Sequence, residues 1–506
     1  MATSAVGSER VSRVVGYKLA RGNFAEASPN LPQRIAVLGE ANTANQSGLS
    51  LAPVQINSAQ QAGKLYGFGS PLYIMARILL PLSGEGVGGI PVVIYPQAAA
   101  VGAVARVQTI TVTGTATAGG THYVTIAGRN GLDGASYAIN IAAGDTPTII
   151  AGRIADTVNA VLGAPVTAAA AAGVVTLTTK WAGLTSQGVG VLIDTTDAGT
   201  TLGLTYAIAQ TVAGSGTPDV GAALALFGSE WNTIVVNSYG TVTATMSALE
   251  AFNGIPDDNT PTGRYAGIIM KPFIAITGST ADDTTTITDG RDTQVTIAIA
   301  PAPLSAGLPM EAAANMTVLE ARMAQDSPHL DVMGRTYPDM PGPIGTPAMT
   351  AYNVRDNAVK KGSSTVDVRS GLYVVQDFVT TYHPAGETPP QFRYVRNLML
   401  DYNVRYGYYL LEQLYVVDHT LAADTDVVTA TNVLKPKDWK GIVSSYADEL
   451  GKRALIADVP FMQNSIAVGI SSVNPDRLES FFRYKRTGTT RISSTTAQAG
   501  FNFGSL

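Results

Sequence analysis

The chain reads RIAVLGEA at residues 34–41 and IPVVIYP at residues 90–96, and each of these short apolar runs is typical of a strand buried on both faces. Between them, residues 58–67 and 70–82 place apolar side chains at the spacing that favours helices. The same alternation returns at residues 219–303, with helices expected at 219–228 and 241–253 and strands at 231–239, 265–278 and 295–303. We therefore predict one interrupted α/β domain, formed by residues 33–100 and 216–340, with a parallel sheet covered by helices on both faces.

The interrupting segment, residues 101–215, has a different composition. It contains no Glu, only nine charged residues and many Thr. Stretches such as ARVQTITVTG (105–114) alternate apolar and polar residues, which predicts half-buried strands, and one helix is expected at 146–162. A low-complexity linker is the alternative, but the period-two apolar residues, with Tyr123 and Trp181, favour a folded, β-rich inserted outer domain with its own core.

The part of the chain that follows a Pro-rich crossing at residues 328–347 predicts an α+β C-terminal domain, residues 341–488. A strand is expected at 371–383 and a hairpin within 465–488. A long helix is expected at 392–417, where apolar residues form more than one stripe and so indicate burial on several sides. A second helix is expected at 438–455, with Asp438 as its N-cap.

Both ends of the sequence have the pattern of extended arms. In the N-terminal arm and linker, residues 1–32, alternate positions would share one side of a strand: Val11, Arg13, Val15, Tyr17 and Leu19. The C-terminal arm, residues 489–506, is polar and includes Arg491, Ile492 and Thr495. The N-terminal arm is either a frayed end or a strand that pairs with another sheet, and the C-terminal arm is expected to be extended.

Charge and composition exclude several functions. The 506 residues include 33 Lys and Arg against 38 Asp and Glu, a net charge of −5 without any basic block, so direct nucleic-acid binding is not expected. The absence of Cys rules out disulfides and thiolate metal sites or nucleophiles. No stretch is apolar enough to predict a signal sequence or stable insertion into a membrane.

No set of residues predicts an active site. Ser279, after a predicted strand, is the best-placed serine, but no G-x-S-x-G motif occurs and the four His lie in separate contexts. The Asp residues between 282 and 292 lack the spacing of a calcium loop. We therefore predict no catalytic, cofactor-binding or metal-ligating residue and no cofactor, with a Ser or metal hydrolase as the competing hypothesis.

One local basic cluster, Lys435, Lys437 and Lys440, is either a solvated helix face or a docking edge for an acidic protein surface.

Residues 300–480 resemble the tail sheath proteins of contractile-tailed bacteriophages of the myovirus type. An Ala-rich helix leads into the D-x-P turn of Asp326 and Pro328 and then to Leu330. Further on, Gly371 opens a strand that ends in Thr-Thr-Tyr at 380–382, before a Pro-rich loop and the long helix that contains Arg393 to Tyr409.

This resemblance implies a structural protein and not an enzyme. It implies a subtilisin-like α/β topology used without catalysis, and a homopolymer of stacked hexameric rings around an inner tail tube protein. It further implies contact with baseplate and tail terminator proteins, assembly in the host cytoplasm, and a place in the virion. The sheath of a phage-tail-like bacteriocin is the alternative, and a secretion-machine sheath is less favoured because one chain carries both arm and C-terminal domain. In the family the two arms add strands to a small sheet of neighbouring subunits, and Lys435, Lys437 and Lys440 are our candidates for facing the tube.

Overall fold

The computed structural model describes residues 29–257, 259–267 and 270–499. Its central sheet has six strands in the order β15-β14-β13-β1-β3-β2. Every pairing in it is parallel except that of β2 with β3. The strands are β1 (Ile35–Glu40), β2 (Val54–Ile56), β3 (Val92–Gln97), β13 (Ile234–Asn237), β14 (Ile274–Ser279) and β15 (Ile297–Pro301). The sheet thus combines strands from both predicted segments of the chain.

Alternate side chains of each central strand enter two different apolar clusters. In β1, Ile35 and Val37 pack in one cluster, whereas Ala36 and Leu38 pack in the other. The first cluster is covered by α2 (Pro71–Leu79) and α7 (Pro309–Asp326), next to α1 (Ala59–Tyr66), and the second by α4 (Gly221–Ala225) and α5 (Thr243–Asn253). Burial on both faces explains why these strands are continuously apolar.

Helix α7 lies very close to the sheet. A Cβ placed on Gly278 of β14 would stand 1.6 Å from the carbonyl oxygen of Pro309, the first residue of α7. Ala313, one turn further along α7, lies on the same face, and its backbone nitrogen would be 3.0 Å from that Cβ. Small residues on both elements therefore permit this separation.

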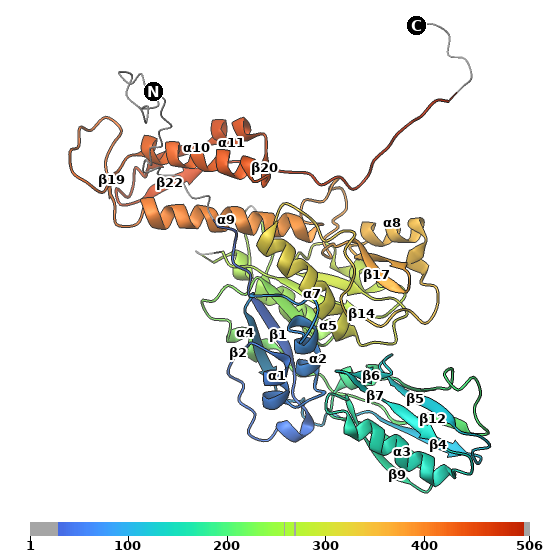
Figure 1. The fold of residues 1–506 in the computed structure, drawn as a ribbon. Coiled ribbons are helices and arrows are strands. Elements are labelled where there is room, and N and C mark those ends of the chain that lie inside the picture. The colour runs from blue at the N-terminus through green and yellow to red at the C-terminus, as the bar shows by residue number, and fades with distance from the viewer. Residues whose placement is uncertain (1–28, 258, 268–269, 500–506) are drawn as a thin grey trace, which may run out of the picture.

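Residues 104–215 form the insertion, which stands at the lower right of Figure 1. Its sheets have the orders β12-β4-β10-β9, β11-β5-β8 and β6-β7, and α3 (Pro147–Ala160) packs against the first two of them. The strands are β4 (Val107–Thr113), β5 (Gly120–Ile126), β6 (Gly131–Leu132), β7 (Ala135–Ser136), β8 (Ala138–Ile141), β9 (Val166–Ala171), β10 (Val174–Thr179), β11 (Val191–Asp194) and β12 (Thr205–Val212). The prediction that the insertion has a core of its own is wrong in one respect. One continuous apolar cluster runs from this insertion into the α/β sheet.

The C-terminal part begins with α8 (Tyr352–Lys360) and the hairpin of β16 (Thr365–Arg369) and β17 (Leu372–Asp377). Helix α9 (Val395–Tyr415) then leads from the α/β body to a unit with its own apolar cluster, which Figure 1 shows in orange and red. That unit contains α10 (Pro436–Lys452), α11 (Val459–Ser465), β18 (Thr420–Leu421), β19 (Val433–Leu434), β20 (Ile456–Ala457), β21 (Ala467–Ile470), β22 (Leu478–Phe481) and β23 (Lys485–Arg486). The remaining short helices are α6 (Thr285–Thr288) and the 3-10 turns Thr43–Asn45, Leu184–Gly188, Gly263–Tyr265, Asp289–Arg291 and Ala348–Thr350.

Several sequence expectations differ from the structure at element ends. Helix α10 starts at Pro436 with Lys435 as its N-cap residue, so Asp438 lies inside the first turn and the predicted cap is wrong. Pro at the first helical position sets this earlier start, because its missing N–H needs no partner there. The strand expected at 371–383 ends at Asp377. Among the helices of the described residues, none combines the length and apolar content that a bilayer crossing requires.

Candidate assembly surfaces

Ser279 has none of the neighbours that a nucleophile needs. It lies at the end of β14 with 5% of its surface exposed, and its hydroxyl accepts the backbone N–H of Ala281 at 3.2 Å. His122 is buried in the insertion, with its Nδ1 2.8 Å from the hydroxyl of Tyr206. Nδ1 of His383 lies 2.7 Å from the backbone carbonyl oxygen of Thr381. Within the described residues, no hydrogen bond joins a histidine to Ser279.

In the Asp-rich loop at 282–292, three of the carboxylates already have hydrogen-bond or ion-pair partners in the protein. Asp282 accepts the backbone N–H of Ala348 at 2.9 Å, and Asp283 accepts that of Thr285 at 2.8 Å. Asp289 pairs with Lys361 at 3.1 Å. In the part of the chain that the structure describes, no group of three or more acidic or His side chains could hold a metal ion.

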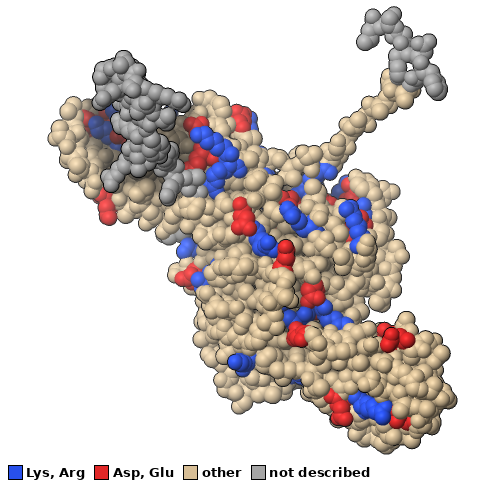
Figure 2. Space-filling view, in the orientation of Figure 1, with Lys and Arg blue, Asp and Glu red and all other residues tan. Residues whose placement is uncertain are grey.

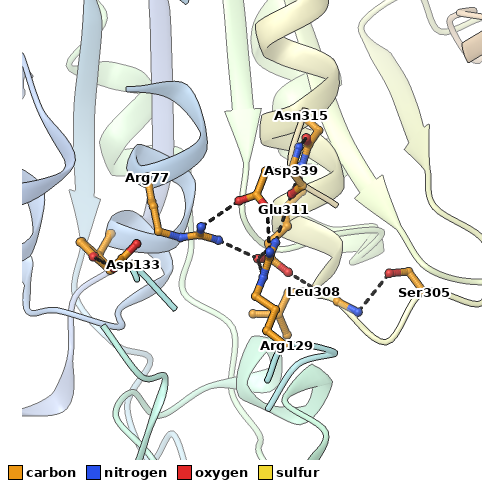
Figure 3. A network of polar contacts seen from close by, with 10 residues as sticks. Arg77, Arg129, Asp133, Ser305, Leu308, Glu311, Asn315 and Asp339 are labelled. Atoms are coloured by element: carbon orange, nitrogen blue, oxygen red, sulfur yellow. Dashed lines mark hydrogen bonds and ion pairs between the residues drawn. The ribbon is translucent and has the colours of Figure 1, made fainter. Parts of the chain in front are cut away.

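A polar network joins the insertion to the α/β body. Arg129, in the turn between β5 and β6, donates to Glu311 of α7 at 3.0 Å and to Asp339 at 2.6 Å. Arg77 of α2 reaches the same two carboxylates at 3.3 and 2.8 Å. Figure 3 shows both guanidinium groups pointing toward Glu311 and Asp339, that of Arg77 from the left and that of Arg129 from below. Two cations and two anions thus meet where three segments distant in sequence come together.

Burial gives this network its strength. The side chain of Glu311 is only 3% exposed, and its second oxygen accepts the backbone N–H of Leu308 at the start of α7. Burial alone would raise the pKa of Asp339, but the charges of Arg129 and Arg77 outweigh it and lower that pKa. Asp339 therefore stays ionised, and both carboxylates have the two arginines as ion-pair partners.

The insertion also contacts the α/β body closely at Gly69. Gly69, at φ +82°, precedes α2, and a Cβ there would lie 2.2 Å from the carbonyl oxygen of Ala164. The two ends of the insertion meet, because Val104 forms a bridge with Ser215. The insertion is therefore joined to the body by its two adjacent chain ends, by this close contact and by the shared apolar cluster.

The three lysines of the basic cluster differ in exposure and in their hydrogen-bond partners. Lys437 is exposed, yet its backbone N–H donates to the carboxylate of Asp424 at 2.9 Å and its ammonium lies 3.4 Å from the Asp424 carbonyl oxygen. Lys435 is half-buried and donates to the carbonyl of Asp426, whereas Lys440 is exposed. Acidic residues of the 424–426 loop thus accompany these lysines, which sequence reasoning did not anticipate.

Two features bear on the predicted arms. Val11, Arg13, Val15, Tyr17 and Leu19 lie outside the described residues. In the C-terminal arm, Arg491 is held against the body, while Ile492 is 83% exposed and Thr495 is exposed. Figure 1 shows the chain up to residue 499 running away from the rest of the molecule.

The strands β21 and β22 form a two-stranded antiparallel sheet, the ribbon. Its pairing joins Ala467 to Phe481 and Ile470 to Leu478. Phe481 is 53% exposed, and Val473 in the connecting turn is 91% exposed. The ribbon packs on α10, and Val468 and Leu478 pack against the apolar cluster of this unit.

The molecular surface carries little charge. Only 14% of the residues are charged, and Figure 2 shows them as small mixed groups separated by wide uncharged areas. The face shown in Figure 2 therefore carries no large area of one sign.

Comparison with known proteins supports the resemblance seen in the sequence. No protein-family model matches the chain. The Mu-like prophage FluMu tail sheath protein of Haemophilus influenzae is 24% identical over 461 residues, which cover 89% of each chain.

Among solved structures, the sheath tail proteins of Desulfitobacterium hafniense and Listeria innocua are 10% and 12% identical, with TM-scores of 0.44 and 0.42. These matches cover 93% and 92% of this chain and 100% and 94% of the other chains. The helical sheath of the anti-feeding prophage in its contracted state is 11% identical, with a TM-score of 0.45, and covers 97% of this chain and 100% of that chain.

The class of protein that this chain resembles is therefore the contractile tail sheath protein. The particular protein to which it is similar along most of its length is the Mu-like prophage sheath protein, and this relation rests on the sequence match.

Proposed function

We propose that this chain is the structural subunit of a contractile tail sheath, without enzymatic activity. The observation that carries the proposal is the match to a tail sheath protein over 89% of both chains. Subunits would stack as six-fold rings around an inner tail tube, in a virion assembled in the host cytoplasm, and would contract to drive the tube through the host envelope. The body would have a subtilisin-like topology, and baseplate and terminator proteins would bind the ends of the polymer.

The link between subunits would be strand addition to the ribbon. The N-terminal arm alternates apolar and polar residues from Val11 to Leu19, and the ribbon offers backbone donors and acceptors at its edges. About five ladder hydrogen bonds at about 1 kcal/mol net each, with burial of the apolar side chains, would give a link of several kcal/mol. Such a link would persist while rigid bodies rotate past each other during contraction.

Removal of the N-terminal arm tests this proposal. Deletion of residues 1–20 is expected to give folded subunits that fail to form cylinders in negative-stain microscopy. Val15→Pro is expected to act similarly because proline removes a ladder donor, whereas Val15→Thr, which keeps the donor and the β-branch, is the matched control. Normal contractile cylinders from the truncated protein would refute strand donation, and cylinders from neither truncated nor intact protein would refute the sheath itself.

The basic cluster would face the tube. Pairs at such a rim contribute at most about 1 kcal/mol each, which suits a grip that is summed over many subunits and released on contraction. Reversal of Lys435, Lys437 and Lys440 to Glu is expected to weaken co-sedimentation of the sheath with tubes and to leave tube-free polymers intact. Lys360→Glu, on the exposed face of α8, is the control. Unchanged co-sedimentation at low salt would reject the assignment.

A further inference from the structure

The C-terminal arm begins with a guanidinium group held in a polar socket. Arg491 pairs with Asp331 and lies 3.1 Å from the carboxylate of Asp377. Its guanidinium carbon is 3.6 Å from the ring centre of Tyr394. The three partners come from the loop after α7, the end of β17 and the residue before α9. One side chain of the arm thus joins three parts of its own subunit.

The charges around the socket make this contact hard to replace. The side chain of Asp331 is 3% exposed, and Arg491 is the cation that forms an ion pair with it among the described residues. Glu320 of α7 is buried nearby, and burial, followed by the charge of Asp331, raises its pKa to about 8. Arg396 is also close, but its guanidinium donates to the backbone carbonyls of His329 and Thr487. Loss of Arg491 would leave the buried carboxylate of Asp331 without its ion-pair partner.

The chain just before Arg491 is also fixed, to α9. The hydroxyl of Tyr484 donates to Asp401 at 2.8 Å, and Arg486 binds the same carboxylate at 2.8 and 2.6 Å. The guanidinium of Arg396 donates a hydrogen bond to the hydroxyl oxygen of Thr487 at 2.7 Å. From Ile492 to residue 499 no side-chain hydrogen bond or ion pair to the body occurs in the described structure. The boundary between the anchored and the free chain therefore falls at Arg491.

We propose that the socket of Asp331, Asp377 and Tyr394 fixes the exit point of the C-terminal arm, so that a second copy of this chain pairs only with residues from Ile492 onward. The role of the second copy rests on the proposed function. The reach of the arm follows from the exit point, since each extended residue adds about 3.3 Å. Loss of the Arg491 contact would free residues 488–491, since Arg486 and Thr487 stay bound to α9, and would add roughly 13 Å to the reach of the arm and let it contact the wrong neighbour. Arg491 is thus a positioning residue for assembly.

Cross-linking within the assembled protein tests the exit point directly. Leu330 and Thr490 are exposed and adjoin Asp331 and Arg491, and the chain has no Cys of its own. In the double variant Leu330→Cys and Thr490→Cys, a short bismaleimide is expected to link the two sites within one chain, in dispersed subunits and in polymers alike. Links between chains in polymers, or loss of the link on assembly, would overturn the proposal. Intrachain links together with absence of any polymer would contradict the proposed function and leave the socket supported.

Substitution of Arg491 tests its role in assembly. Arg491→Ala is expected to raise the protein concentration required for polymers by about tenfold or more, and Arg491→Lys, which retains the charge, to recover part of this change. Arg477→Ala removes an exposed arginine of the same unit, which forms a surface ion pair with Glu479, and is expected to change nothing. Arg491→Ala polymers that form at the wild-type concentration would overturn the proposal, whatever the stability of the variant.

Discussion

At the scale of single residues, one unusual group is Glu40, at the carboxyl end of β1. It is 1% exposed, its Oε1 has no partner among the described residues, and the hydroxyl of Thr185 donates to Oε2 at 3.4 Å. Burial raises its pKa from 4.5 to about 8, and the Thr185 hydrogen bond offsets only part of this effect. The folded chain therefore keeps a proton that the unfolded chain loses above pH 4.5. The free energy of unfolding then falls as pH rises from about 4.5 to about 8, by up to about 1.4 kcal/mol per pH unit.

Glu40→Gln is expected to remove this part of the pH dependence and to make the subunit more stable than wild type at pH 8. The neutral amide keeps an acceptor for Thr185 and has no proton to lose. Urea midpoints at pH 5, 6.5 and 8 measure the effect, and Glu85→Gln, at a site whose side chain is 74% exposed, is the control. The assignment fails when wild type and Glu40→Gln show the same slope over this range.

At the scale of elements, the network of Arg129, Arg77, Glu311 and Asp339 determines how the insertion meets α7. Arg129→Ala is expected to lower the free energy of unfolding by about 2–3 kcal/mol, because Glu311 stays buried with Arg77 as its one remaining guanidinium partner among the described residues. Arg129→Lys restores the charge but not both pairs, so it is expected to recover part of the loss. Arg322→Ala breaks an exposed pair with Glu85 and is expected to change stability by less than about 0.5 kcal/mol. Thermal midpoints compare the three, and equal midpoints for Arg129→Ala and Arg322→Ala would contradict this account.

At the scale of the whole molecule, the insertion stands apart from α9 and from the ribbon, as Figure 1 shows. Ala100 and Gly216 lie close together, since a Cβ on Gly216 would be 3.5 Å from that of Ala100. Replacement of residues 101–215 by a short Gly/Ser bridge is therefore expected to preserve polymers, while the subunit loses stability because the shared apolar cluster is cut. Microscopy and thermal unfolding together measure both effects. Soluble, folded subunits without any cylinders would count against an outer position for the insertion.

Local sequence determined the elements. The apolar runs at 34–41 and 90–96 became β1 and β3, and the expected helices at 58–67 and 241–253 became α1 and α5, because strand and helix periods are properties of neighbouring residues. The hairpin expected in 465–488 likewise became β21 and β22. The resemblance to tail sheath proteins also came from residue order alone, and a sheath relative confirms it.

Only the tertiary structure decided which charges meet. Glu40 ends an apolar run and Arg129 follows a strand, so neither position indicates burial or a partner in the sequence. Arg491 was expected only to belong to an extended arm, yet it pairs with Asp331, 160 positions earlier in the chain. Contacts at such separations depend on the packing of α7, β17 and α9, whereas periodicity reports only which face of an element is apolar. The sequence by itself therefore specified strands, helices and family resemblance, whereas the buried ion pairs and the exit point of the arm arose from the assembled fold, because charge pairing depends on distance in space rather than along the chain.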